Sequence, residues 1–287
     1  MKNTNLEFWD TIITPHRGWF EFRLKELWQF KDLLWIIIKR DVVTQYKQTL
    51  LGPLWLFIQP ILTTVVFTVI FGNIAKLSTD GLPKPLFYLA GIVAWNYFST
   101  CLTSTSISLS GNAALFGKVY FPRMIMPLGT VISSLVRFFI QVLLLILMII
   151  YYSNFTGTLN LNVHFTHVLL FPILILIMGI QGLGYGLILS ACTVKYRDLR
   201  YLISFGVRLL MYASPVIFPI SIVPEKYLPY ILANPMTAVI ETFRFISLGQ
   251  GNYNFNTLGY SIFMTFVIFF IGLLLFNRVE KNFIDSV

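Results

Sequence analysis

Apolar residues run along this chain in long uninterrupted stretches rather than in the short segments of a soluble core. Two of these runs, 54–75 and 141–163, contain no Lys, Arg, Asp or Glu. A helix of roughly 20 apolar residues is long enough to cross about 30 Å of hydrocarbon. Six such segments can be drawn, at residues 54–75, 86–109, 128–152, 168–192, 201–220 and 258–277. The pattern therefore predicts an all-α membrane protein with six transmembrane helices.

Residues 20–38, ahead of the first span, place apolar and polar side chains at helical spacing. This pattern predicts an amphipathic helix lying on the inner leaflet of the membrane. A helix packed on a soluble partner is the alternative. The apolar positions are Phe20, Leu24, Leu27, Trp28, Leu34, Trp35 and Ile38. A charged stop at 39–41 follows, and Pro53 breaks the backbone so that the first span can begin at a new angle.

The segment 111–127 is too polar to cross a membrane and is rich in aromatic residues. It contains two charges that flank an aromatic pair, in the run Lys118, Val119, Tyr120, Phe121, Pro122 and Arg123. Such a composition suits a short helix that docks into a groove on a partner protein. A generic loop on the inner side is the alternative.

Five prolines divide residues 214–250 into pieces too short to span a membrane. Irregular backbone at membrane depth is tolerated only where it is buried in protein or lines a wet cavity. We therefore expect residues 222–247 to form a re-entrant or outer-surface pair of helices that caps a pathway. A plain extracytoplasmic loop is the alternative, although many of these side chains are apolar.

Composition agrees with a membrane protein, because 56% of the 287 residues are hydrophobic and only 11% are charged, against roughly a quarter in soluble domains. The net charge of +9 agrees with the predicted membrane orientation, because Lys and Arg are enriched in cytoplasmic segments of membrane proteins. Fifteen of the 21 Lys and Arg residues fall in segments predicted on the inner side, and four in outer segments. We expect both termini in the cytoplasm, with no signal peptide and no nucleic-acid partner. The chain then divides into an N-terminal segment (1–53), a six-span domain (54–277) and a C-terminal tail (278–287).

The sequence contains no recognisable catalytic or metal site. A phosphate-binding loop would need a different spacing and a hydroxyl after Lys118, and the pair His164 and His167 has no third metal ligand nearby. We therefore expect the chain itself to bind no cofactor and to be no enzyme. Two cysteines, Cys101 and Cys192, are expected to pack in apolar surroundings without forming a disulfide.

Four charged residues in apolar surroundings carry more information. Arg137 and Arg208 fall inside predicted spans, where ionisable side chains usually face a bundle interior or a water-filled path. Each could instead extend to the membrane interface. Glu241 and Arg244 are spaced to pair on one helix face, which we interpret as a structural contact.

Three motifs follow one another in order from about residue 19 to the C-terminus. The first covers residues 26–28, 32–34, 40–41, 46–55 and 59–60, the second 118–123 with Pro127, and the third 195–198, 214–216, 223–226, 234–236 and 243–244. Together they resemble the permease subunit of ABC exporters, of the ABC-2 type, for O-antigen, capsule and teichoic-acid-like polysaccharides.

The resemblance implies a homodimer of six-helix subunits bound to two copies of a separate ATPase subunit, which would hold ATP and magnesium. The cargo would be a lipid-linked polysaccharide moved outward across the bacterial inner membrane. It also implies that 111–127 contains the coupling helix received by the ATPase. A gate at the cytoplasmic entrance would involve Arg40, Asp41, Tyr46 and Lys47. The sequence departs from the family at Gln45, where a basic residue is common, and at Arg137, where several relatives have an acid.

Aromatic rings of the first two spans could line a polymer path, because ring faces bind sugars weakly and repeatedly. These rings are Trp55, Phe57, Phe67, Phe71, Tyr88, Trp95, Tyr97 and Phe98. Ordinary packing and interfacial aromatic belts are the alternatives. Two other functions stay open: an ABC exporter of drugs or small lipids, and an integral glycosyl- or acyltransferase. The transferase would need a facing cluster of carboxylates or histidines, which the sequence does not offer.

Overall fold

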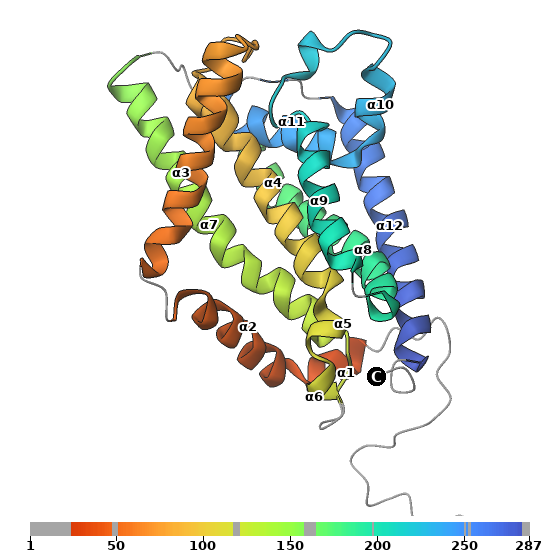
Figure 1. Ribbon diagram of the computed structural model, residues 1–287. Coiled ribbons are helices and arrows are strands. Elements are labelled where there is room, and N and C mark those ends of the chain that lie inside the picture. The colour runs from red at the N-terminus through yellow and green to blue at the C-terminus, as the bar shows by residue number, and fades with distance from the viewer. Residues whose placement is uncertain are drawn as a thin grey trace, which may run out of the picture.

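The computed structural model describes residues 24–47, 51–116, 121–157, 165–196, 198–249, 251 and 254–282. All regular secondary structure in these ranges is helical, and the long helices form one bundle (Figure 1). The segments are α1 (Leu24–Gln29), α2 (Lys31–Tyr46), the short 3-10 helix η2 (Gly52–Leu54), α3 (Trp55–Phe67), the π-helix η3 (Thr68–Ile74), α4 (Lys84–Ser106), α5 (Ser108–Gly111), α6 (Ala113–Phe116), α7 (Ile125–Asn154), α8 (Phe165–Lys195), α9 (Leu199–Tyr212), the 3-10 helix η4 (Ile220–Ile222), α10 (Leu228–Ala233), α11 (Pro235–Leu248) and α12 (Phe255–Asn282).

Five of the six predicted spans are confirmed as helices long and apolar enough to cross a membrane. They are Gly52–Ile74, which joins η2, α3 and η3, then Lys84–Ser106, Ile125–Asn154, Leu169–Thr193 and Phe255–Val279. The first and last residues of each helix lie within a few residues of those predicted from the sequence. The protein is therefore a helical, multi-pass membrane protein.

A full-length span over 201–220 is not borne out. The helix here, α9, has 14 residues, which corresponds to about 21 Å at 1.5 Å per residue and falls short of the membrane core. After Tyr212 the chain enters a non-helical bend, residues 213–219, that contains Pro215 and Pro219. Proline cannot donate the hydrogen bond that would continue the helix, so the apolar run outlasts the helix.

The centre of the bundle is formed by α4 and α8. In the apolar window of α4 78% of residues are buried, and in that of α8 61%, against 17% for the first span. Glycine permits this packing: a Cβ on Gly186 would lie 2.4 Å from the Thr105 Cβ, and one on Gly272 of α12 would lie 2.6 Å from the Gly184 carbonyl oxygen. The backbone of α8 therefore lies close to both α4 and α12.

The bundle has two ends, which we name by the helices that cover them. The α2 end carries α1, α2, α5 and α6, and the α11 end carries α10 and α11 (Figure 1). Within the described residues the predicted N-terminal helix appears as α1 and α2. The charged run 39–41 does not end it as expected, because α2 continues to Tyr46. Its residue Ile37 packs against α7 at Gly129, whereas Trp28, Trp35 and Ile36 are exposed. The helix thus has two apolar faces, one of which packs on the bundle and one of which is free to meet lipid.

The segment 222–247 forms two helices with different environments. Residues 224–230 are mostly exposed, whereas nearly all of α11 is buried against α4, α8 and α12. Helix α11 begins at Pro235, where the Asn234 side chain accepts a hydrogen bond from the Met236 amide at 3.1 Å, and ends at Gly249, which adopts a φ of 73°. The second half of this segment is therefore a packed helix and not a solvated loop.

Replacing Gly186 by alanine should destabilise the protein, because the new methyl group would overlap Thr105. Overpacking of this kind costs about 1–3 kcal/mol and should outweigh the gain of about 1 kcal/mol in helix propensity. The measurement is the fraction of monodisperse protein that survives heating in detergent. Gly259→Ala on α12 is the matched control, since its Cβ would meet nothing within 4 Å. Equal midpoints for the two variants would contradict the close packing of α4 and α8.

Candidate functional site

The first group of predicted site residues lies where α2 meets α7. Arg40 donates from Nε and Nη2 to Asp41 Oδ1 at 3.0 and 2.8 Å, and Thr44 Oγ1 donates to the Arg40 carbonyl oxygen at 2.5 Å. The Arg40 side chain remains 45% exposed. Lys47 is exposed just after α2, and the side chain of Tyr46 lies outside the described part of the chain. A cationic, partly neutralised surface is therefore present at this end.

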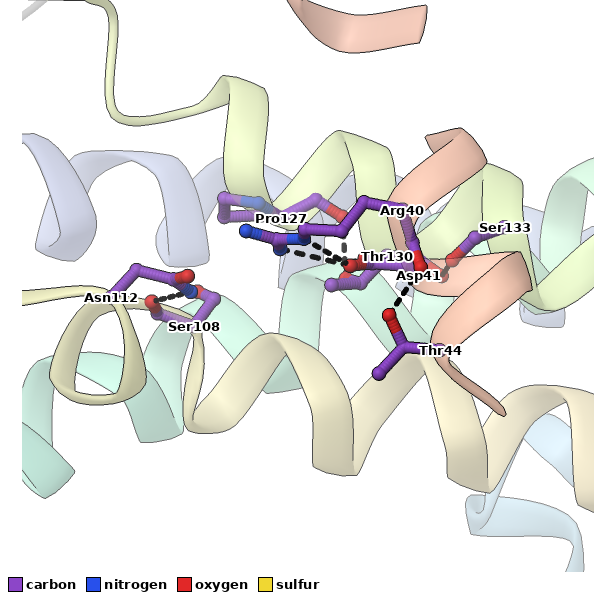
Figure 2. Close-up of polar contacts among 8 residues, drawn as sticks. All are labelled: Arg40, Asp41, Thr44, Ser108, Asn112, Pro127, Thr130 and Ser133. Atoms are coloured by element: carbon purple, nitrogen blue, oxygen red, sulfur yellow. Dashed lines mark hydrogen bonds and ion pairs between the residues drawn. The ribbon is translucent and has the colours of Figure 1, made fainter. Parts of the chain in front are cut away.

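Figure 2 shows the polar residues of α7 and α5 that lie near this pair. Thr130 Oγ1 donates to the Pro127 carbonyl oxygen at 2.8 Å and Ser133 Oγ to the Thr130 carbonyl oxygen at 3.1 Å. Asn112 Nδ2 donates to the Ser108 carbonyl oxygen at 2.8 Å. Every hydrogen bond drawn in Figure 2 joins residues at most four positions apart along the chain. Among these residues no hydrogen bond joins α2 to α7, whereas apolar side chains of both helices pack together in the cluster around Ile37.

The predicted coupling segment is described only in part. Lys118, Val119 and Tyr120 lie outside the described residues. Phe121 is buried, with its ring 5.3 Å from that of Phe116 on α6. Pro122 is half-buried, and Arg123 is buried with its guanidinium carbon 5.7 Å from the centre of the Phe116 ring. The described half of the segment therefore packs inside the subunit, between α6 and the cluster around Ile37.

The eight aromatic residues considered for a polymer path divide into two groups. Five of them pack in the core at 6% exposure or less, namely Phe67, Tyr88, Trp95, Tyr97 and Phe98. Phe57 and Phe71 are half-buried and Trp55 is 52% exposed. The buried rings contact one another and α7, with 5.3 Å between Trp95 and Phe98 and 5.0 Å between Tyr97 and Phe138. Because α4 is the central helix, its rings have little surface within the subunit for a passing sugar.

Sequence reasoning missed a polar and aromatic stripe on α9. Arg200, Ser204 and Arg208 recur every four residues and therefore lie on one face of the helix. Ser204 and Arg208 are exposed. Beside them the exposed aromatic residues are Tyr201, Phe205 and Tyr212, at 81%, 61% and 51%. The four-residue spacing was the available signal, but Arg208 was considered by itself. The other arginine that the sequence places in a span, Arg137, is half-buried on α7.

The predicted pair on α11 is confirmed. Arg244 Nη1 donates to Glu241 Oε1 at 2.7 Å, and both side chains are almost completely buried. Burial lowers the pKa of the Arg244 guanidinium from its ordinary value, while the Glu241 carboxylate acts in the opposite direction. In the described ranges no three His, Cys, Asp or Glu residues are grouped to hold a metal ion.

Comparison with known proteins connects this architecture to membrane transport. Residues 32–248 match the family model described as ABC-2 type transporter. The chain is 24% identical over 254 residues to the O-antigen export system permease protein of Klebsiella pneumoniae, covering 88% of this chain and 94% of the relative. It is 27% identical to the protein of that name from Myxococcus xanthus, covering 78% and 83%. It is 25% identical to the polysialic acid transport protein of Escherichia coli, covering 86% and 93%.

Two tryptophans from the candidate path should behave differently on truncation. Trp95→Ala removes a buried ring and should cost about 3–5 kcal/mol of stability, which would lower the amount of folded protein. Trp55→Ala removes a half-exposed ring and should leave that amount nearly unchanged. The measurement is membrane-inserted, monodisperse protein per cell. Equal losses for the two variants would show that Trp55 is also a packing residue.

Proposed function

Because the chain belongs to the ABC-2 type transporter family, we propose that it is the membrane-spanning permease subunit of an ATP-driven exporter of lipid-linked polysaccharide, of the O-antigen kind. The observation that carries the proposal is that relatives matched over most of their length are polysaccharide export permeases. The membrane is the bacterial inner membrane, and the cargo passes outward from the cytoplasmic leaflet.

The working unit is two copies of this chain with two copies of a separate ATPase subunit, which binds ATP and magnesium. We assign the α2 end and both termini to the cytoplasm, since most Lys and Arg residues fall in the segments that the sequence predicts on the inner side. The sixth crossing is then made by α9 together with the bend that follows it. Helices α10 and α11 form a re-entrant pair that closes the outer end.

The exposed stripe of α9 is the part of the subunit that best fits the polysaccharide path. An arginine at membrane depth is expensive against lipid and usually faces a hydrated space. Arg208 meets that condition, Ser204 lies one turn before it on the same face, and the neighbouring rings of Tyr201 and Phe205 could bind sugar faces weakly. Trp55 on α3 remains a candidate for the same path. In the dimer this stripe would face the second copy across the path.

The α2–α7 junction fits a gate at the cytoplasmic entrance. Arg40 offers donors for a lipid phosphate, but Asp41 already accepts two of them, so cargo binding would compete with this pair. Ile37 contacts α7 through apolar groups, and none of the hydrogen bonds drawn in Figure 2 joins α2 to α7. Helix α2 could therefore shift without breaking any of them. Tyr46 and Lys47 would complete the gate.

The coupling segment would carry ATPase movements to this gate. Phe121 and Arg123 pack in the subunit near the cluster around Ile37, which suits residues that anchor the segment. Contact with the ATPase would then fall to Lys118, Val119 and Tyr120, with Pro122 at the start of the turn that leads into α7.

The proposed function is tested by deleting the gene and analysing the cell's glycans. We expect a lipid-linked polysaccharide to be retained inside the cell and lost from the surface, because its exit route is missing. The tagged chain should co-purify with an ATPase, and by itself should hydrolyse no ATP. Normal surface glycans, together with retention of a drug or small lipid, would support the alternative exporter.

A variant on the α9 stripe tests the path. Arg208→Gln should reduce surface polysaccharide by about a factor of ten, the effect of losing one charge-assisted contact of roughly 1.5 kcal/mol, with the amount of folded protein unchanged. The control is Lys76→Gln, which removes an exposed cation in the loop after η3 and should leave export normal. Export by Arg208→Gln at the level of the control would remove α9 from the path.

A further inference from the structure

Arg244 connects three parts of the α11 end. Its guanidinium donates from Nη1 to Glu241 on its own helix at 2.7 Å and from Nη2 to the Pro215 carbonyl oxygen at 2.6 Å. The guanidinium carbon lies 3.7 Å from the centre of the Phe87 ring on α4. The residue is 1% exposed. One side chain therefore joins α11, the bend after α9, and α4.

Few backbone hydrogen bonds stabilise the bend that Arg244 contacts. Residues 213–219 are non-helical, and Ser214 to Ile217 are buried. Buried backbone carbonyls need donors, and a helix C-terminus attracts positive charge. Arg244 meets both needs at the Pro215 carbonyl. A second tie is made by Ser214, whose Oγ donates to the Leu210 carbonyl oxygen at 2.6 Å and accepts from Asn234 Nδ2 at 3.0 Å.

The fit of the bend against α4 is close on its other side. A Cβ on Gly91 would lie 3.1 Å from the Val216 Cα and 3.2 Å from Arg244 Nη2. Glycine at this position therefore leaves the space in which the bend and the guanidinium meet. Val216 itself has no exposed surface.

Arginine suits this position better than another cation would. Its planar guanidinium can donate in two directions while a ring faces it, whereas the single ammonium of lysine cannot reproduce that geometry. The Glu241 carboxylate offsets the buried charge, so the contact with Pro215 does not leave an isolated cation.

We propose that Arg244 is a positioning residue that latches the bend at 213–219 to α11 and α4, and thereby fixes the outer end of α9. The latch consists of Arg244, Glu241, Phe87, Gly91 and the Pro215 carbonyl. Since α9 carries the stripe assigned to the polysaccharide path, its role in transport rests on the proposed function: outward movement of α9 has to break the bond to Pro215. The latch itself stands on the contacts alone.

The test is the reactivity of a cysteine placed behind the latch. Val216→Cys, in membrane fragments whose two faces are both open to a membrane-impermeant maleimide, should label slowly when Arg244 is present. Combining it with Arg244→Met should raise the labelling rate by at least about fivefold, because the bend opens more often, and Arg244→Lys should fall between the two. Ser221→Cys, on an exposed residue, should label equally in all backgrounds, and labelling of the chain that carries neither introduced cysteine is subtracted.

Only protein that elutes as a folded species is counted, which separates local opening from loss of folding. If Arg244→Met does not accumulate, Gly91→Ala replaces it, since the added methyl group presses on the same bend, with Gly206→Ala as the control that meets nothing within 4 Å. Slow labelling of the Val216→Cys thiol in folded Arg244→Met or Gly91→Ala protein would overturn the latch. The labelling experiment does not depend on any glycan, so the two proposals can fail separately. If labelling confirms the latch but the deletion strain has normal surface glycans, only the proposed function is rejected.

Discussion

The close approach of α8 to its two neighbours sets the geometry of the whole bundle. At Gly186 and Gly184 the backbone of α8 comes so close to α4 and α12 that a larger side chain would not fit between the helices. Lipid supplies little hydrophobic drive for helices to associate, so close packing has to hold such helices together. Once α4 and α8 form a tight pair, their remaining surfaces define where α7, α9 and α11 can pack. The first span, which lies outside this pair, keeps most of its surface exposed.

The second constraint is that buried backbone polar groups need partners, and it explains the α11 end. Helix α9 is too short to cross the membrane core by itself, and most of the bend after it is buried in the protein. Side chains then take over the hydrogen bonds that a longer helix would have made internally: Ser214 bonds back to α9, Asn234 bonds to Ser214, and Arg244 bonds to Pro215. A buried ion pair is costly in isolation. Here it has a definite task, which is to hold a broken helix in place.

Helix α2 and the bend at the α11 end are held to the bundle in different ways. Helix α2 meets α7 through apolar contacts, although one side-chain hydrogen bond at this end joins distant elements, from Thr193 Oγ1 on α8 to the Ser106 carbonyl oxygen of α4 at 2.6 Å. At the α11 end side-chain hydrogen bonds cross between elements far apart in sequence. Apolar contacts tolerate sliding more readily than buried polar bonds tolerate breaking. This difference agrees with the roles proposed for the two ends, in which α2 shifts at the entrance while the bend at the α11 end stays closed until its buried bonds break.

The sequence by itself determined the membrane class, five of the spans, the pairing of Glu241 with Arg244, and the family, because apolar length, helical spacing and ordered motifs are local properties of the chain. The span predicted at 201–220 was longer than the helix found there, because hydropathy does not show where prolines end a helix. Only the tertiary structure decided that Trp95 packs in the core while Trp55 is exposed, that Phe121 is buried, and that one face of α9 is left open. The reason is physical: a ring has the same composition in a core, at a membrane interface and along a path, and the neighbours that distinguish these places come from helices distant in sequence.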